Sequence, residues 1–198
     1  MLAPLPLMDW KSVFRTRAKK ARAIAHQAQP HAGRFAAAKF MEALKPEPGQ
    51  TVALYHPKGD ELDTAPLAEA LAKDGIAVVL PVVTGKGEPL VFRLFEVDRA
   101  LTPGPHGILQ PPGDAPERRP DIVVCPLLAA READGARLGM GGGYYDRTLA
   151  KLRAEGEVVV VGYGYGDQLT DRFPVGPKDE PLDWFVSERG ARRFTKRG

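Results

Sequence analysis

The chain has 198 residues, of which 43% are hydrophobic and 27% are charged, and its formal net charge is +3. This balance is typical of a globular protein and excludes a disordered chain, a coiled coil and a fibre. A chain of this length buries enough surface to fold without disulfides or metal staples. We therefore expect residues 1–198 to form a single domain, with residues 1–45 as a basic helical segment packed on it.

Cysteine content and hydropathy restrict the class of protein further. The single cysteine, Cys125, excludes a disulfide framework and every multi-cysteine zinc site. It stands between an apolar run and Pro126, so we expect a buried, inert thiol. No apolar run approaches the roughly 18 residues that a membrane span requires, and residues 1–10 carry no basic side chain and two prolines, unlike a signal peptide. These features indicate a cytoplasmic protein with no membrane association.

Basic residues are concentrated at the N-terminus. Residues 1–45 hold nine lysines and arginines against two acidic residues, whereas the rest of the chain is net negative. Such a segment is typical of a solvated helix face, of a site for an acidic small ligand, or of a nucleic-acid-binding helix. A nucleic-acid surface has aromatic side chains among its charges, but Trp10 and Phe14 lie on the predicted apolar stripe instead. We therefore expect no nucleic-acid partner.

Helical periodicity predicts a helical pair over residues 9–27 and 31–44. Asp9 is a suitable N-cap for the first helix, and Pro30 starts the second. Lys11 and Arg15 are four residues apart, so they project from one side of the first helix and together suit a phosphate or a carboxylate. The apolar positions expected to face inward are Trp10, Val13, Phe14, Ala18, Ala21 and Ala25 in the first helix, and Phe35, Phe40, Met41 and Leu44 in the second.

Beyond Gly49 the pattern changes to alternating strands and helices. The predicted helices cover residues 64–73 and a segment after Gly143, and the predicted strands cover residues 51–55, 76–80, 90–95, 122–125, 158–161, 184–187 and 192–195. The strand over residues 122–125 is apolar on both faces, which is typical of a central parallel strand. The alternation predicts an α/β fold, a three-layer αβα arrangement with a mostly parallel central sheet, preceded by the N-terminal helical pair.

The densest chemistry lies in a glycine-rich loop, Arg137-Leu-Gly-Met-Gly-Gly-Gly-Tyr-Tyr-Asp-Arg147. Glycines let successive backbone N–H groups converge on one point, and the helix that follows adds partial positive charge, so the loop is suited to phosphate. Arg137 and Arg147 flank it, and Asp146 is suited to a Mg²⁺ ion shared with phosphates. The loop is neither a Walker A motif nor a dinucleotide fingerprint. The alternative interpretation is a flexible turn between a strand and a helix.

Other residues carry weaker signals. The four histidines lack metal spacing, and neither serine lies in a nucleophile elbow, which argues against a serine hydrolase. Glu61 and Asp63 follow the first predicted strand, at the edge of an open α/β sheet where ligands bind. Asp179 and Asp183 follow a later strand and are either a second source of carboxylates or an exposed acidic loop.

The glycine-rich loop resembles the signature loop of the 5-formyltetrahydrofolate cyclo-ligase family, also called methenyltetrahydrofolate synthetase. The similarity extends along nearly the whole chain. Its weaker pieces occur in the family's order and are Lys11-Ser-Val-Phe-Arg15, Leu54-Tyr-His-Pro, Glu61-Leu-Asp-Thr, Pro126-Leu-Leu-Ala, Gln168 and Asp179…Asp183.

This resemblance implies ATP- and Mg²⁺-dependent cyclisation of 5-formyltetrahydrofolate to 5,10-methenyltetrahydrofolate, with release of ADP and phosphate. The formyl oxygen is a poor leaving group, so it would first be phosphorylated. Phosphoryl transfer needs positioning and charge neutralisation more than covalent help from a protein. The implied partners are a reduced folate and ATP. We expect the protein to be a monomer.

The resemblance also implies roles for single residues. The expected catalytic residues are Arg137, Tyr145 and Arg147. The expected Mg²⁺ ligands are Asp146 and Asp179. The residues expected to bind the folate substrate are His56, Glu61, Met140 and Tyr144. The residues expected to bind ATP are Lys11, Arg15, Arg137, Leu138, Gly139, Met140, Gly141, Gly142, Gly143, Tyr144 and Tyr145.

Two positions depart from the family pattern. Many members carry a lysine where this chain has Gly142, so Arg137 or Arg147 is expected to supply the missing positive charge. Members often have an aliphatic residue where this chain has His56. Two other classes of function remain as alternatives: a sugar-phosphate isomerase or CoA-transferase-like phosphate-binding protein, and a nucleic-acid-binding module that uses the basic helix.

Overall fold

The structure is a computed structural model that describes residues 10–171, 173, 175–176 and 179–195. The predicted N-cap, Asp9, lies outside the described residues. Within them, none of the helices combines the length and the apolar character that crossing a bilayer demands. The helices are α1 (Trp10–Ala28), α2 (Ala32–Leu44), α3 (Ala65–Lys73) and α4 (Tyr144–Glu155), with the 3-10 turns η1 (Pro105–Gly107) and η2 (Gly166–Gln168).

One seven-stranded sheet forms the centre of the protein. Its strands are β1 (Thr51–Ala53), β2 (Ala77–Val82), β3 (Val91–Leu94), β6 (Ile122–Cys125), β9 (Val159–Tyr163), β10 (Trp184–Ser187) and β11 (Gly190–Arg193). They lie in the order β11-β10-β9-β6-β1-β2-β3. The five inner strands are parallel, whereas β3 and β11 run antiparallel to their neighbours at the two edges. The predicted α/β class with a mostly parallel sheet is confirmed.

The limits of some strands differ from the prediction. The first strand ends at Ala53, two residues early, and β2 continues through Pro81 to Val82 because it pairs with β3 on its second side. Two short ribbons were not predicted, since two-residue strands are too short to show an alternating pattern. They are β4 (Thr102–Pro103) with β5 (Leu109–Gln110), and β7 (Ala129–Ala130) with β8 (Arg137–Leu138).

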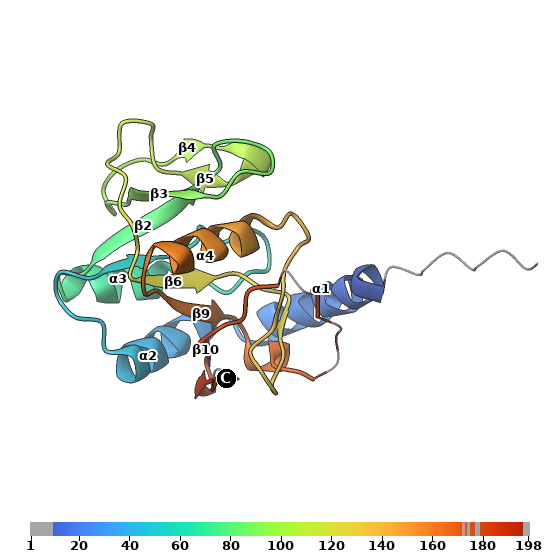
Figure 1. The fold of residues 1–198 in the computed structure, drawn as a ribbon. Coiled ribbons are helices and arrows are strands. Elements are labelled where there is room, and N and C mark those ends of the chain that lie inside the picture. The colour runs from blue at the N-terminus through green and yellow to red at the C-terminus, as the bar shows by residue number, and fades with distance from the viewer. Residues whose placement is uncertain (1–9, 172, 174, 177–178, 196–198) are drawn as a thin grey trace, which may run out of the picture.

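Helices cover both faces of the sheet. On one face, α2 and α3 pack through Phe40, Leu67 and Leu71 against strand residues such as Val52 and Val124. On the other face, α4 packs alone through Leu149 and Leu152 against the alternate strand residues. Figure 1 shows α4 on one side of the sheet and α2 with α3 on the other, while α1 lies beyond the ends of the strands. The core thus occupies both interlayer spaces, while α1 adds Ala25 to it and packs Phe14 and Ala18 in a smaller apolar cluster.

Burial on the first two helices departs from the predicted stripes. Phe35, expected to face inward, is 61% exposed, because α2 turns its small residues Ala32, Ala36 and Ala37 to the core. Ala21 is exposed on α1, and the buried residue beside it is Arg22, which is only 5% exposed. Periodicity identified the helices correctly, and Phe14, Ala18 and Ala25 of α1 do pack in apolar clusters. It selected the wrong face at Phe35 and Ala21, because periodicity finds an apolar face but not the surface that covers it.

The turn between β7 and β8 gives a test of the packing. Gly135 has φ +72°, and a Cβ there would lie 2.7 Å from both the Leu182 carbonyl oxygen and a ring carbon of Phe194. We expect Gly135→Ala to lower the free energy of unfolding by about 1 kcal/mol for the backbone conformation and a further ~1–3 kcal/mol for overpacking. Urea unfolding measures the loss.

The matched control is Gly87→Ala. Gly87 also has a positive φ, +84°, but a Cβ there meets no atom within 4 Å. It should therefore lose only the backbone contribution. Equal losses in the two variants would show that the Gly135 contacts do not constrain the fold.

Candidate functional site

Helix α1 lies against the carboxyl ends of the parallel strands. Near its centre, Arg22 donates to the Leu127 carbonyl oxygen (3.3 Å), just after β6, and to Asp60 Oδ1 (2.6 Å), in the loop after β1. One turn later, His26 Nδ1 lies 2.8 Å from the hydroxyl oxygen of Tyr165, just after β9. These contacts tie α1 to three neighbouring strand ends. Ligands bind at this edge in open α/β sheets.

The glycine-rich loop connects β8 to α4 at the same edge. Gly141 has φ +102° and Gly143 has φ +67°, so both adopt conformations that other residues rarely take. The first bond within α4 is donated by the Arg147 N–H to the Gly143 carbonyl oxygen (3.1 Å). The N–H groups of residues 144–146 precede this bond and have no partner within the helix. The loop therefore presents backbone donors at the positive end of the α4 dipole.

Three segments far apart in the sequence meet around this loop. From α1, Arg15 Nε donates to the Gly139 carbonyl oxygen (3.2 Å), and Lys11 Nζ forms an ion pair with Asp179 (2.7 Å). From the segment before β10, the Glu180 N–H donates to Asp146 Oδ1 (3.4 Å). The structure thus brings together the two cations, the glycines and the two carboxylates that the sequence singled out.

Two arginines support the loop from different sides. Arg137 is 6% exposed, donates to Asp146 Oδ1 (2.8 Å), and lies with its Cζ 5.4 Å from the ring centroid of Tyr145. Arg147 donates to the Gly142 carbonyl oxygen (3.0 Å) and stacks over Tyr144 (5.2 Å). Arg137 is thus buried beneath the loop, whereas Arg147 lies beside Gly142.

Side chains around the loop differ in their exposure. Leu138 is buried, whereas Met140 is 57% exposed. Burial raises the pKa of the Tyr145 phenol well above its usual value, with smaller contributions from Cys125 and Glu61. The Tyr145 hydroxyl therefore keeps its proton at neutral pH and is a hydrogen-bond donor rather than a base.

The loop after β1 carries two of the four residues expected to bind the substrate, His56 and Glu61. His56 is partly buried, and Glu61 Oε2 accepts a bond from the Lys58 N–H (2.9 Å). Glu61 Oε1 lies 3.6 Å from Arg22 Nη1. Burial raises the pKa of the Glu61 carboxyl, and the Lys58 N–H and Arg22 oppose this rise. Glu61 also contributes to the raised pKa of Tyr145. We call residues 56–63, which include Asp60, Glu61 and Asp63, the acidic loop.

Sequence reasoning did not find Arg22, His26 and Tyr165 as residues of this edge. They have no shared motif, because α1 contributes two of them and the end of β9 the third. Their only sequence signal is helical spacing, which puts Arg15, Arg22 and His26 on one side of α1. Gln168 is buried nearby, where its Nε2 donates to the Leu127 carbonyl oxygen (2.7 Å).

The donor set fits a magnesium ion only together with phosphate oxygens. No cluster of three or more His, Cys, Asp or Glu side chains suited to a metal occurs within the described part of the chain. Asp146 and Asp179 are each paired with a cation, Arg137 and Lys11. Mg²⁺ commonly takes one or two carboxylates and completes its shell with water and substrate phosphates, and two carboxylates at the phosphate loop match that pattern.

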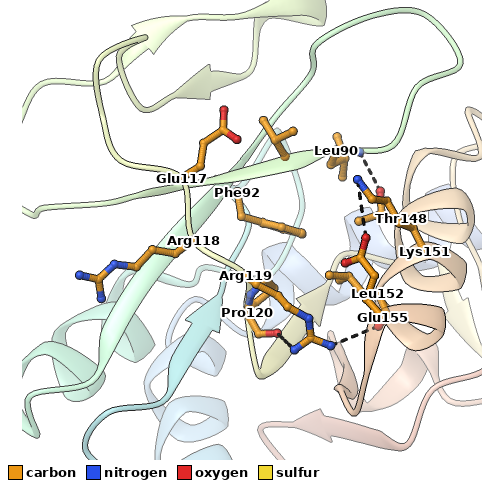
Figure 2. A pocket seen from close by; sticks show the side chains of 11 residues that line it. Leu90, Phe92, Glu117, Arg118, Arg119, Pro120, Thr148, Lys151, Leu152 and Glu155 are labelled. Carbon is orange, nitrogen blue, oxygen red and sulfur yellow. Dashed lines mark hydrogen bonds and ion pairs between the residues drawn. The ribbon is translucent and has the colours of Figure 1, made fainter.

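A separate cavity of about 230 Å³ lies away from this edge. Figure 2 shows it between β3, residues 117–120 and α4, with Arg119 reaching the end of α4. There Arg119 Nη2 donates to the carbonyl oxygens of Leu152 (3.1 Å) and Glu157 (3.0 Å). None of the predicted site residues lines this cavity.

The geometry defines an α/β protein with a glycine-rich loop at the carboxyl edge of its sheet, where backbone N–H groups, cations and carboxylates meet. The model of the 5-formyltetrahydrofolate cyclo-ligase family matches residues 7–188. The 5-formyltetrahydrofolate cyclo-ligase of Escherichia coli (strain K12) is 35% identical over 174 residues, which cover 85% of this chain and 94% of that protein. The Mycolicibacterium smegmatis protein of the same name is 34% identical over 143 residues, which cover 66% of this chain and 70% of that protein.

Solved structures agree with the sequence comparison. The NMR structure of Aquifex aeolicus 5,10-methenyltetrahydrofolate synthetase has a TM-score of 0.78 and 26% identity, and the match covers 95% of this chain and 94% of that one. The Mycoplasma pneumoniae 5,10-methenyltetrahydrofolate synthetase has a TM-score of 0.69 and 26% identity, with coverage of 91% and 99%. The chain belongs to the 5-formyltetrahydrofolate cyclo-ligase family, and the prediction of a ligase of this kind is confirmed.

Cys125 at the end of β6 gives a test of burial at this edge. The thiol is fully buried, as expected, and burial raises its pKa to about 12. The thiolate is the reactive form, so at about pH 8 we expect native protein to resist a disulfide reagent such as DTNB. Addition of urea should release one equivalent of reactive thiol. Rapid stoichiometric labelling of the folded protein would contradict this burial.

Proposed function

We propose that this protein converts 5-formyltetrahydrofolate to 5,10-methenyltetrahydrofolate with consumption of ATP, in the presence of Mg²⁺. The formyl oxygen attacks the γ-phosphorus and ADP leaves, which gives an imidate phosphate. The N10 nitrogen of the folate then attacks the formyl carbon and loses its proton, and the carbon–oxygen bond to phosphate breaks. The products are the methenyl compound, ADP and phosphate.

One observation carries this proposal: the glycine-rich loop, two cations of α1 and two carboxylates meet at one edge of the sheet. In this proposal the amides of residues 139–143 hold the ATP phosphates, with Lys11 and Arg15 above them. A bound Mg²⁺ would neutralise phosphate charge at Asp146 and Asp179. Donors fixed before the reaction stabilise the developing charge without reorganisation.

Other side chains have more local roles in the proposal. Arg137 holds Asp146 in place from beneath the loop, and Arg147 lies where it can supply the charge that Gly142 lacks. The Tyr145 hydroxyl keeps its proton and acts as a donor. The folate lies along the acidic loop, where Glu61 accepts hydrogen bonds from it, between His56 on one side and Met140 with Tyr144 on the other.

The direct test is the absorbance of the methenyl product formed from 5-formyltetrahydrofolate, measured with and without ATP. We expect product only with ATP and Mg²⁺, in equal amount to the phosphate released. Product without ATP, or ATP hydrolysis without product, would contradict the proposal.

The charges on α1 allow the enzyme to be distinguished from a nucleic-acid-binding protein. Lys11 and Arg15 face the loop, whereas Arg17 and Lys20 are exposed on the same helix. Replacing both Lys11 and Arg15 with Ala should weaken ATP binding by about 1.5–3 kcal/mol for each charged hydrogen bond lost, as measured by calorimetry.

The control is the double variant Arg17→Ala and Lys20→Ala, which removes the same charge from the exposed face. It should bind ATP as the wild type does. If both double variants instead lose affinity for duplex DNA equally and keep full turnover, the nucleic-acid alternative is correct.

The loop itself is tested by Gly141→Ala. The substitution strains a backbone at φ +102° and places a Cβ 3.3 Å from Arg15 Cζ. Mg-ATP should raise the melting temperature of the wild type by mass action, and the variant should lose most of that gain. Gly87→Ala is again the control, because it has the same kind of strain in open space. A full ATP-induced shift in Gly141→Ala would show that the loop does not bind phosphate.

A further inference from the structure

Arg22 is the one charged residue described on α1 that the fold buries, and its position is not explained by phosphate binding. It lies seven residues beyond Arg15, on the side of the helix that faces the acidic loop. Its guanidinium contacts Asp60 Oδ1 (2.6 Å), the Leu127 carbonyl oxygen (3.3 Å) and Glu61 Oε1 (3.6 Å). It therefore joins α1, the loop after β1 and the end of β6.

The pairing of this arginine is incomplete. Its Nε–H is buried and has no hydrogen-bond partner among the described residues. A buried donor without a partner costs free energy, and so does a charge removed from water. Apolar residues of similar size in place of Arg22 and its partner Asp60 would hold α1 against the strand ends without this cost. The charge at Arg22 thus has a use beyond packing.

That use concerns Glu61, whose carboxylate is partly buried. Burial favours the protonated acid and raises the pKa of Glu61, while the Lys58 N–H and the Arg22 charge favour the carboxylate. Arg22 approaches from α1, and the other titratable or charged groups near Glu61 are Asp60 and Lys58 on its own loop, Tyr55 after β1 and Tyr145 on α4. Arg22 and Lys58 are the only positive groups in this set.

We propose that Arg22 is a positioning residue that holds Glu61 as a fixed carboxylate, able to accept hydrogen bonds from N–H groups of the reduced folate. The inference rests on the proposed function, because it assigns Glu61 to the folate. It separates the work of α1 into two parts: Lys11 and Arg15 serve the phosphates, and Arg22 serves the folate through Glu61.

The experiment compares Arg22→Met, which keeps the length of the side chain, with Arg22→Lys, which keeps its charge. Near pH 6.5, Arg22→Met should raise KM for 5-formyltetrahydrofolate by about tenfold, the order expected when a charged hydrogen bond to a ligand is lost. KM for ATP should stay within about twofold of the wild-type value, because the substitution leaves the residues proposed to bind ATP unchanged. Arg22→Lys should restore most of the folate affinity.

The pH profile separates positioning from a general structural loss. Without the Arg22 charge, burial dominates and the pKa of Glu61 rises further, so more of the acid is protonated near pH 6.5. The KM defect of Arg22→Met should therefore shrink as pH rises towards 9. Glu61→Gln should weaken folate binding at every pH, and the double variant should be no worse than Glu61→Gln, since the two residues act together.

Arg119→Met is the structural control, because Arg119 also bridges carbonyl groups but lies beside the remote cavity of Figure 2. It should lower the melting temperature without changing KM for either substrate. If Arg22→Met raises both KM values alike, or its defect is independent of pH, Arg22 is only a structural residue and the inference is wrong. If Arg22→Met does not fold, the test uses KM for 5-formyltetrahydrofolate in Arg22→Lys and Glu61→Gln as a function of pH. An equal rise in KM in these two variants would overturn the inference, because Arg22→Lys keeps the charge and should bind folate nearly as the wild type does.

Calorimetric binding of 5-formyltetrahydrofolate without ATP distinguishes this inference from the proposed function. If the wild type binds folate but forms no product, the proposed function is wrong. Folate binding by the Arg22 variants then still tests the role of Arg22. A wild type that binds no folate contradicts the inference directly.

Discussion

A guanidinium group withdrawn from water must be neutralised at short range, and Arg22 places this constraint on the whole carboxyl edge of the sheet. Its partners, Asp60 and Leu127, follow β1 and β6, which are adjacent strands. The hydrogen bonds of Arg22 to these partners therefore hold α1 against the strand ends. Since α1 is continuous, Arg15 two turns away and Lys11 three turns away are fixed with it. Lys11 and Arg15 are also held at the glycine-rich loop by their own bonds to Asp179 and to the Gly139 carbonyl oxygen, so they do not depend on the Arg22 charge alone.

The site combines backbone and side-chain chemistry in separate layers. The glycines supply N–H donors whose direction is set by φ values that only glycine adopts readily, at Gly141 and Gly143. Beneath them, Arg137 links Asp146 to the end of β6 through the Pro126 carbonyl oxygen (3.4 Å). A loop rich in glycine is entropically costly to order, and the buried arginine and the start of α4 confine it from both ends. Anion binding then needs little rearrangement of the chain.

Opposite charges already stand in pairs around the loop. Lys11 with Asp179 is a partly exposed pair, and such pairs add little to stability. In the pair of Arg137 with Asp146 the arginine is buried, and the attraction offsets the cost of removing its charge from water. Their value lies in placement: each pair holds a cation and a carboxylate within reach of the same loop. A polyanionic substrate with its metal ion could exchange partners with them without leaving a charge unpaired. This arrangement agrees with a reaction whose demands are positioning and charge neutralisation.

Most of the fold could be predicted from local sequence. Apolar runs over residues 122–125 and 158–161 identified inner strands, helical spacing identified four helices, and the concentration of glycine before α4 identified the loop. These signals are local because strand and helix periodicity depend on neighbours a few residues apart. The same reasoning failed at Phe35 and Ala21, since periodicity finds an apolar face but not the surface that covers it.

The tertiary structure alone decided which charges work together. Arg22 pairs with residues 38 and 105 positions away, and Lys11 pairs with Asp179, 168 positions away. In the sequence, Arg22 is one basic residue among nine at the N-terminus. The amino-acid sequence by itself determined the helices, the strands of the central sheet, the class of fold and the position of the glycine-rich loop. Only the packing of α1 across the strand ends determined which basic side chain is buried, because the energy of a charge depends on partners that folding brings within a few ångströms.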